Sequence, residues 1–308
     1  MKVLITGGAG YLGTALAQRL SHDERVDELV VYDNLARRNH NLFLVNDMGP
    51  RPLRFVRGDV LDSRRVKQAL AGVDVVFHLA ARVTTPFADA DFHGLEQVNH
   101  WGTAELGYRL EEAPCARLIY TSSASVYGSS DTEVDHTREP RPKTAYAIAK
   151  RNGEKMLDRL GDRLGLYQIR SANVYGYNAS MRFDAVVNRF MFDAHYTRHL
   201  TVHGSGRQHR AFVHIDNAIT ALVACGMGDV PPGTYDLVER NLSVLDIAET
   251  IHGLYDDLEM LFLQQDLQLR DLRVKRDERL AHLLDGRSFE EQLTEFKERF
   301  AFLPGQVL

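Results

Sequence analysis

The residues best suited to acid–base chemistry are a tyrosine and a lysine four positions apart, in Tyr146-Ala147-Ile148-Ala149-Lys150. Because residues four apart share one face of a helix, this spacing would hold a phenol beside an ammonium group. A nearby positive charge favours the phenolate, so we expect the pKa of Tyr146 to lie below its usual value of about 10. Tyr146 is then a candidate to exchange a proton with a substrate hydroxyl. Alone, the pair could equally be two unrelated helix residues.

A glycine-rich turn near the N-terminus predicts a dinucleotide site. The apolar run at residues 3–5 is typical of a buried strand, and Gly8, Gly10 and Gly13 follow it before a helical pattern. This spacing fits the dinucleotide fingerprint, in which glycine allows a tight turn and a close approach of the backbone to pyrophosphate. The helix N-terminus adds N–H groups for the phosphates. A turn without any ligand is the alternative.

An acidic residue after the second predicted strand extends this prediction. Residues 28–32 form an apolar run that ends at Asp33, 20 residues beyond Gly13, where a ribose-binding acid is expected. A carboxylate at this position accepts hydrogen bonds from both ribose hydroxyls and repels a 2′-phosphate. We therefore predict NAD in preference to NADP. Arg37 and Arg38 keep NADP as an alternative, although a solvated loop is the simpler interpretation.

Strands and helices alternate to about residue 175, which predicts an α/β fold with a doubly wound parallel sheet of the Rossmann type. Further strands are predicted at residues 53–56, 73–77 and 118–120, and a long helix at residues 91–112. Ligands bind at the carboxyl ends of the strands of such sheets.

Polar side chains follow two of these strands. Asp59 comes after the third and could hold the adenine amino group. The hydroxyl cluster at residues 121–125 follows the fifth, and its alternative is an ordinary polar turn.

The chain is expected to divide near residue 175. We predict an NAD-binding Rossmann domain at residues 1–175 and a smaller, helix-rich substrate-binding portion at residues 176–308. A segment near residues 211–226 is predicted to return to the main domain. An amphipathic helix at residues 290–299 is expected to cover the core.

The composition is that of an ordinary soluble globular chain, with 44% hydrophobic and 26% charged residues. A net charge of -5 gives no general attraction to nucleic acid or anionic lipid, and no apolar run approaches membrane-spanning length. Two cysteines suit a reducing compartment, and no signal peptide precedes the first predicted strand, so we expect a cytoplasmic protein.

His195 and His199 could share a helical face, but no carboxylate-bearing zinc motif accompanies them, and we predict no metal.

Together these motifs resemble the extended short-chain dehydrogenase/reductases, specifically the NAD-dependent nucleotide-sugar epimerase/dehydratase family. The resemblance covers nearly the first 240 residues. It rests on residues 6–13, 33–35, 58–60, 78–81, 98–103, 122–128, 146–150, 170–176 and 204–210.

The resemblance implies a role for each matching residue. Ser123 would hydrogen-bond the reacting hydroxyl of the substrate, Tyr146 would be the acid/base, and Lys150 would hold the nicotinamide ribose while acidifying the phenol. Asn173 and Arg210 would meet the substrate diphosphate; without its motif, Arg210 would be interpreted as a surface salt-bridge residue. The implied NAD-binding residues are Gly7, Gly10, Tyr11, Leu12, Asp33, Asn34, Asp59, Val60, Leu79, Ala80, Ala81, Asn99, Tyr146 and Lys150.

The sequence departs from the family in two places. The 4,6-dehydratases carry an Asp-Glu pair after the catalytic hydroxyl residue, whereas this chain has Ala124 and Ser125, which points away from dehydration. Residues 267–276 stand where the family usually has other C-terminal motifs. The resemblance therefore says least about the residues that contact the sugar.

We therefore expect NAD-dependent epimerisation of a nucleotide-diphosphate sugar, at carbon 4, through transient oxidation to a keto-sugar. The alternative enzyme is a one-way sugar or alcohol oxidoreductase or decarboxylase with the same triad. A non-enzymatic cofactor-binding regulator is the alternative from another class, but such proteins usually lose the tyrosine or the lysine. The resemblance also implies a homodimer through the helices at about residues 91–112 and 144–162.

Overall fold

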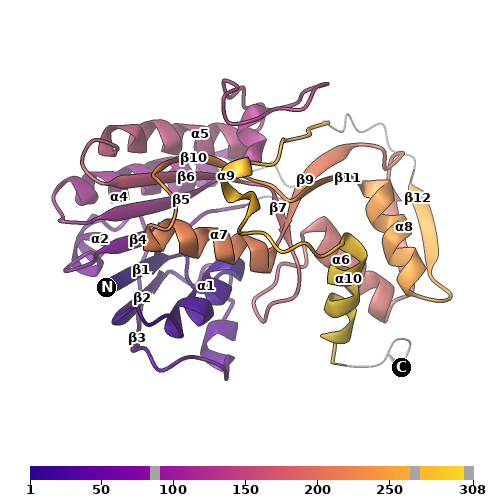
Figure 1. Ribbon diagram of the computed structural model, residues 1–308, viewed down its shortest axis with the longest axis horizontal. Coiled ribbons are helices and arrows are strands. Elements are labelled where there is room, and N and C mark those ends of the chain that lie inside the picture. Colours follow the sequence, from indigo (N-terminus) through magenta and orange to yellow (C-terminus); the bar gives the residue numbers. More distant parts are fainter. Residues whose placement is uncertain (84–90, 264–270, 302–308) are drawn as a thin grey trace.

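Seven parallel strands form the central sheet, in the order β10-β6-β5-β4-β1-β2-β3 (Figure 1). The computed structural model describes residues 1–83, 91–263 and 271–301. The strands are β1 (Lys2–Thr6), β2 (Glu28–Asp33), β3 (Leu53–Arg57), β4 (Val75–His78), β5 (Arg117–Ser123), β6 (Gly165–Ser171) and β10 (Gly233–Leu237). The strand order reverses between β1 and β4, and the carboxyl ends there form the crevice in which such sheets bind ligands. The predicted doubly wound α/β fold is confirmed.

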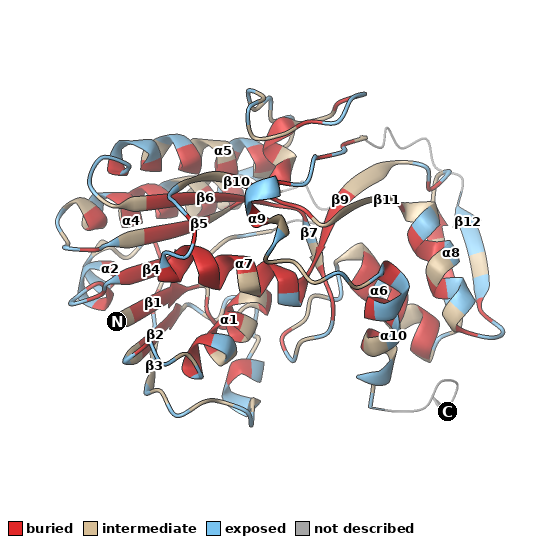
Figure 2. Ribbon diagram, viewed as in Figure 1, coloured by how far each residue is buried: buried red, intermediate tan, exposed pale blue. Residues whose placement is uncertain are grey.

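Helices cover both faces of the sheet, which is why the inner strands β1, β2 and β4 are largely apolar and buried (Figure 2). One layer contains α1 (Tyr11–Ser21) and α7 (Ile215–Met227), which pack against each other. The opposite layer contains α2 (Ser63–Ala69), α4 (Gly102–Glu111) and α5 (Ala145–Leu157).

The long helix predicted at residues 91–112 is interrupted. It consists of α3 (Phe92–Glu96), a π-helical turn η2 (Gln97–Trp101) and α4. Such turns often occur at functional sites. Here the turn directs the buried Asn99 side chain towards the backbone of Arg82, in the segment that follows β4.

The second half of the chain adds smaller sheets, which pack around a hydrophobic core of their own. A three-stranded sheet contains β7 (Asn173–Tyr175), β9 (His209–His214) and β11 (Arg240–Ser243), and a two-stranded sheet pairs β8 (His199–His203) with β12 (Glu259–Leu263). The helices beside them are α6 (Val186–Tyr196), α8 (Val244–Leu254), α9 (Glu278–Ala281) and α10 (Phe289–Glu298). Residues 267–270, part of the unusual C-terminal stretch, lie outside the described residues.

His195 and His199 do not share a helical face, so that hypothesis is wrong. Helix α6 ends at Tyr196, Arg198 takes a positive φ of 59°, and His199 begins strand β8. The positive φ turns the chain out of the helix before the second histidine is reached.

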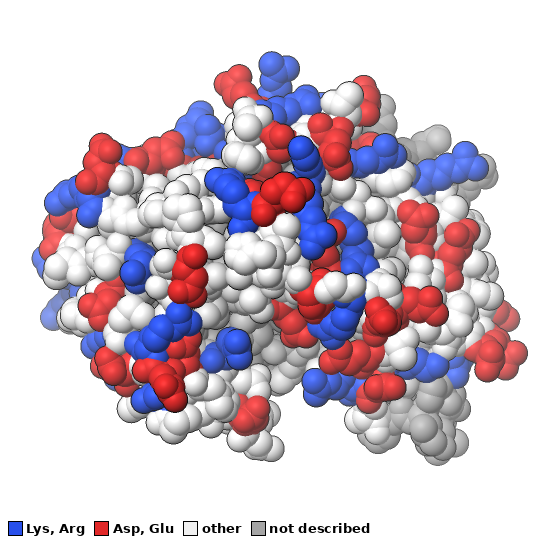
Figure 3. All heavy atoms as spheres, viewed as in Figure 1, with Lys and Arg blue, Asp and Glu red and all other residues white. Residues whose placement is uncertain are grey.

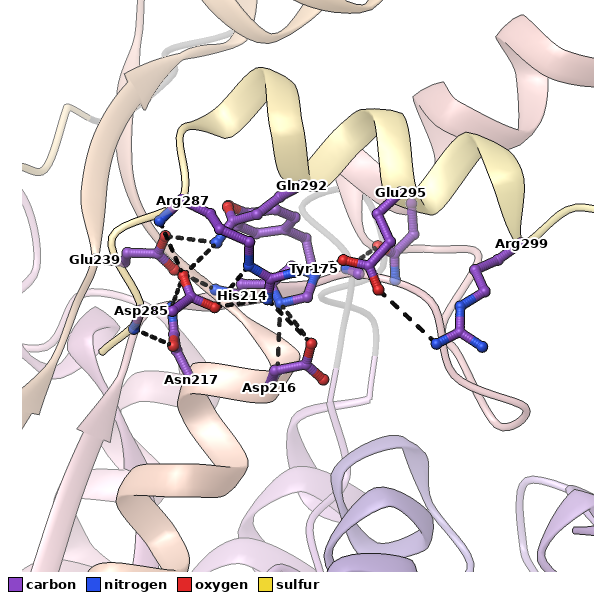
Figure 4. Close-up of polar contacts among 12 residues, drawn as sticks. Tyr175, His214, Asp216, Asn217, Glu239, Asp285, Arg287, Gln292, Glu295 and Arg299 are labelled. Atoms are coloured by element: carbon purple, nitrogen blue, oxygen red, sulfur yellow. Dashed lines mark hydrogen bonds and ion pairs between the residues drawn. The ribbon is translucent and has the colours of Figure 1, made fainter. Parts of the chain in front are cut away.

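A polar cluster anchors the C-terminal helix α10 to the rest of the fold (Figure 4). Arg287 forms ion pairs with Asp216 at the start of α7, at 3.2 Å, and with Asp285, at 2.6 Å. The hydroxyl of Tyr175 on β7 donates to Gln292 on α10. These contacts join β7, α7 and α10.

Charges of both signs are mixed over the face shown in Figure 3, where the described residues form no large patch of a single sign. Within residues 1–83, 91–263 and 271–301, no helix has the length and apolar character needed to cross a bilayer.

The packing of α7 on the sheet predicts different effects for two helical glycines. A Cβ at Gly226 would lie 2.1 Å from Cζ of the buried Phe77 ring, whereas a Cβ at Gly253 in α8 would meet nothing within 4 Å. Overpacking costs about 1–3 kcal/mol, while alanine gains about 1 kcal/mol over glycine in a helix. Gly226→Ala should therefore lower the free energy of unfolding measured by urea titration, and Gly253→Ala, the matched control, should raise it by about 0.5–1 kcal/mol. Equal effects of the two substitutions would contradict this packing.

Candidate active site

The glycine turn has the geometry that a dinucleotide site requires. Gly7 has a positive φ of 71°, and a Cβ there would lie 2.6 Å from the backbone nitrogen of Ala80. A Cβ at Gly13 would lie 2.4 Å from the carbonyl oxygen of Gly7, so only glycine allows this approach. Helix α1 begins at Tyr11, and its N-cap, Gly10, has no side chain to occupy the first N–H groups. Those N–H groups and the positive end of the helix dipole are suited to bind phosphate.

Asp33 is fixed at the end of β2 by two backbone N–H groups. Its carboxylate accepts hydrogen bonds from Leu35, at 2.7 Å, and Ala9, at 3.1 Å. Burial raises the pKa of Asp33, and these two hydrogen bonds act in the opposite direction. Nearby, the Asn34 amide donates to Asp59 at 2.8 Å. Asn34 and Asp59, both predicted to bind NAD, therefore lie together.

Arg37 is held by an acidic residue from the second half of the chain. Its guanidinium lies 3.5 Å from the carboxylate of Asp184, which also accepts two hydrogen bonds from Arg182 at 2.8 and 2.9 Å. This pairing competes with any role of Arg37 in binding a 2′-phosphate. An exposed ion pair of this kind contributes at most about 1 kcal/mol.

The three groups predicted to act on the substrate meet at the carboxyl end of β5. Ser123 is the last residue of β5, and its Oγ accepts hydrogen bonds from the N–H and the hydroxyl of Ser125, at 3.2 and 2.9 Å. Its own proton therefore stays available for another acceptor. Tyr146 and Lys150 lie on α5, whose first turn is capped by the side chain of Thr144.

One cleft of about 1430 Å³ contains both the glycine turn and these three groups. That volume exceeds the usual size of a single small-molecule pocket, so the cleft can hold a dinucleotide and a second ligand. Of the residues predicted for the site, those that line it are Gly7, Gly10, Tyr11, Leu12, Asp33, Asn34, Asp59, Val60, Leu79, Ala80, Ala81, Ser123, Tyr146, Lys150, Asn173 and Arg210.

Asn99 is the predicted site residue that lies behind the cleft wall. Its amide oxygen accepts from the N–H of Arg82 and its amide nitrogen donates to the carbonyl of Arg82, both at 2.8 Å. Asn99 is completely buried. It therefore shapes the wall formed by residues 79–83.

Residues 3–235 match the NAD dependent epimerase/dehydratase family, which is well over half of the chain. The chain belongs to this family.

Named relatives differ in their reactions. The mouse dTDP-D-glucose 4,6-dehydratase is 28% identical over 259 residues, covering 81% of this chain and 72% of that protein. The UDP-glucuronic acid decarboxylase 1 of Xenopus tropicalis is 28% identical over 295 residues, covering 92% of this chain and 68% of that protein. The structure of UDP-glucuronic acid 4-epimerase from Bacillus cereus, in complex with UDP-glucuronic acid and NAD, superposes with a TM-score of 0.83. Its identity is 24%, with 97% of this chain and 98% of that chain covered, so this likeness concerns the fold.

The protonation of the family's Tyr-x-x-x-Lys pair differs from the prediction. Burial raises the pKa of Tyr146, and the charge of Arg182 and hydrogen bonding with Ser123 oppose this only in part. The predicted direction is wrong, because desolvation of the phenolate is the largest effect.

Lys150 is itself strongly affected by its surroundings. Its ammonium group donates to the carbonyl of Thr121 at 2.8 Å and lies 5.0 Å from the centre of the Tyr120 ring. Burial lowers the pKa of Lys150 to about 7, while the negative charge of Glu154 acts in the opposite direction. Burial therefore disfavours the ammonium form of Lys150, and its charge depends on nearby groups such as Glu154.

Three residues of this epimerase/dehydratase-family site were missed in the sequence. Arg182 and Asp184 belong to the segment before α6 and reach the cleft only through the tertiary fold. Glu154 had a usable signal, because it continues the four-residue spacing of Tyr146 and Lys150 along one helix face.

The Asp33 geometry predicts a preference for NAD. Calorimetric titration should show tighter binding of NAD than of NADP, and Asp33→Ala should weaken NAD binding about 10- to 100-fold because hydrogen bonds to a charged group are lost. NADP binding should change less.

Asp229→Ala, which removes an exposed partner of Arg25, is the control and should leave both affinities unchanged. Equal or reversed affinities in the wild-type protein would mean that Arg37 or Arg38 determines the choice of cofactor.

Proposed function

We propose that this protein is an NAD-dependent epimerase that inverts carbon 4 of a nucleotide-diphosphate sugar. In this proposal residues 1–175 bind NAD and residues 176–308 bind most of the substrate. The observation that carries it is the composition of the cleft around Ser123: the proton-transfer groups Ser123, Tyr146 and Lys150 line it, and among the described residues no acid suited to drive elimination accompanies them.

The carboxylates of the cleft support this choice. Among the described residues, the acidic side chains lining the cleft are Asp33, Asp59, Asp184 and Asp193. Two lie at the adenosine end, Asp184 binds Arg182, and Asp193 accepts from Arg189 at 2.6 Å. The positions after Ser123 hold a buried alanine and a serine whose hydroxyl donates to Ser123.

Each side chain has a distinct task in the proposed reaction. NAD, when bound on the glycine turn, supplies reversible hydride acceptance at the carbon that bears the reacting hydroxyl. Ser123 holds that hydroxyl, and Tyr146 takes its proton and later returns it. Only the phenolate form of Tyr146 can take this proton, and the Lys150 ammonium stabilises that phenolate, which the raised pKa of Tyr146 makes necessary. Asn173 and Arg210 hold the diphosphate, for which a guanidinium fork is well matched.

A decarboxylase acting on a nucleotide-linked uronic acid is the second candidate. It is favoured by the UDP-glucuronic acid decarboxylase relative, whose match extends over 92% of this chain. It would use the same proton-transfer groups and release carbon dioxide.

A panel of UDP- and dTDP-linked sugars and uronic acids, incubated without added cofactor, tests both candidates. The proposal predicts a 4-epimer of one of them and no carbon dioxide. Carbon dioxide with a pentose product would favour the decarboxylase, and a 4-keto-6-deoxy product would contradict the argument from Ala124 and Ser125.

Tyr146→Phe should abolish turnover while leaving folding and NAD affinity nearly intact, because only the proton-transferring oxygen is removed. General acid–base groups contribute about 10²–10⁴-fold, and the loss in kcat should be at least of that order. Tyr177→Phe, at an exposed position that does not line the cleft, is the matched control and should keep wild-type activity. Near wild-type kcat in Tyr146→Phe on a verified substrate would refute the tyrosine-based mechanism.

We also propose that the protein forms a homodimer through α3, α4 and α5. Large apolar side chains remain exposed on these neighbouring elements and on the π turn between them: Phe92, Trp101, Tyr108 and Ile148. Light scattering should give twice the 34.8 kDa chain mass, and the double variant Trp101→Glu/Tyr108→Glu should give the monomer. Phe43→Glu, at another exposed aromatic residue, should stay dimeric. A wild-type monomer at micromolar concentration would contradict this interface.

A further inference from the structure

A carboxylate with no role in the proposed reaction lies behind Lys150. Glu154 is on α5 one helical turn after Lys150 and two turns after Tyr146. It is completely buried, with 0% of its surface exposed. Burying an isolated carboxylate is strongly unfavourable, so the groups that compensate its charge indicate what it does.

Four hydrogen bonds fix the Glu154 carboxylate. The Ser122 hydroxyl donates at 2.6 Å, Arg170 donates two hydrogen bonds at 3.0 Å, and Arg151 donates one at 2.8 Å. Arg170 is itself buried, and its bidentate pairing with Glu154 is the geometry preferred by a guanidinium and a carboxylate. Ser122 directly precedes Ser123, so the network reaches the end of strand β5.

Glu154 is the principal negative charge for Arg170. On its other side Arg170 donates to the Tyr127 hydroxyl at 2.9 Å, which donates to Asp236 at 2.7 Å. Burial raises the pKa of Asp236 to about 7, so this second carboxyl group is only partly charged at neutral pH.

The other titratable groups around Lys150 do not supply a negative charge. On β4, burial lowers the pKa of His78 to about 3, so its ring is neutral. On β5, burial raises the pKa of Tyr120 well above its usual value, and on α5 the pKa of Tyr146 is raised as well, so both phenols are neutral at pH 7. Of the residues that the structure describes on this side, the other charged groups are Arg151 on α5, Arg170 on β6 and Arg182 beside Tyr146, all cations.

We propose that Glu154 is a positioning residue: its buried carboxylate, held by Arg170 and Arg151 one helical turn from Lys150, keeps Lys150 in the ammonium form that the acid–base site uses. The inference rests on the proposed role of Lys150 in that site. This arrangement has a testable signature: removing Glu154 takes a negative charge away from Lys150 and removing Arg170 takes a positive charge away, so the two changes must move the pKa of Lys150 in opposite directions.

The test is a titration of Lys150 followed by NMR in the full-length protein with saturating NAD and ¹³C-labelled lysine. The chain has only seven lysines, and the signal of Lys150 is identified by its loss in Lys150→Met. Glu154→Gln should lower the midpoint by about one pH unit or more, so that the ammonium is lost at lower pH. Arg170→Gln should raise the midpoint, and the double variant should return it towards the wild-type value. Glu111→Gln, which removes a carboxylate paired with Arg159 outside the site, should leave it unchanged.

An unchanged midpoint in both single variants, or a shift in the same direction, would overturn the proposal and leave Glu154 a purely structural residue. If Glu154→Gln does not fold, Arg170→Gln decides alone, since a raised midpoint supports the proposal and any other result overturns it. The titration needs no substrate. A negative result for Glu154 is therefore distinguishable from a failure of the proposed epimerase activity.

Discussion

Helix α5 lies so close to strand β5 that only a glycine fits at their contact. A Cβ at Gly153 would lie 2.5 Å from the Tyr120 hydroxyl oxygen and 3.0 Å from the carbonyl of Asn99. This approach places the face of α5 that carries Tyr146 and Lys150 against the carboxyl end of β5, where Ser123 lies. The same contact buries Lys150, while Ser123 and Tyr146 still line the cleft.

Desolvation favours the neutral form of both partners of the acid–base pair. The pKa of Tyr146 rises and that of Lys150 falls to about 7, which is opposite to the effect of a simple solvent-exposed ion pair. Charged groups fixed by the fold must therefore favour the states that the proposed reaction uses. Arg182 acts on the tyrosine and Glu154 acts on the lysine, and each is held by hydrogen bonds to other charged side chains. Preorganised charges of this kind avoid the reorganisation that water would require.

The sequence predicted the parts of this structure that depend on local spacing. The strands, the glycine turn and Asp33 were predictable because buried parallel strands are apolar throughout and because the turn requires glycine at fixed positions. The π-helical turn at residues 97–101 was not, since a helical pattern continues through it. The direction of the Tyr146 pKa was mispredicted because spacing reveals a neighbouring charge but not the depth of burial. Arg182 and Asp184 have no local signal, because they reach the cleft from a loop that is distant in the sequence.

The central claim is that one carbon of a nucleotide sugar is oxidised and reduced again within a single cleft. The most direct measurement uses a nucleotide sugar with deuterium at carbon 4, incubated in ordinary water without added cofactor, with the product examined by NMR. The account predicts inversion at carbon 4 with the deuterium retained at that carbon. Loss of the deuterium to solvent, or its retention with an unchanged configuration at carbon 4 in a converted product, would contradict it.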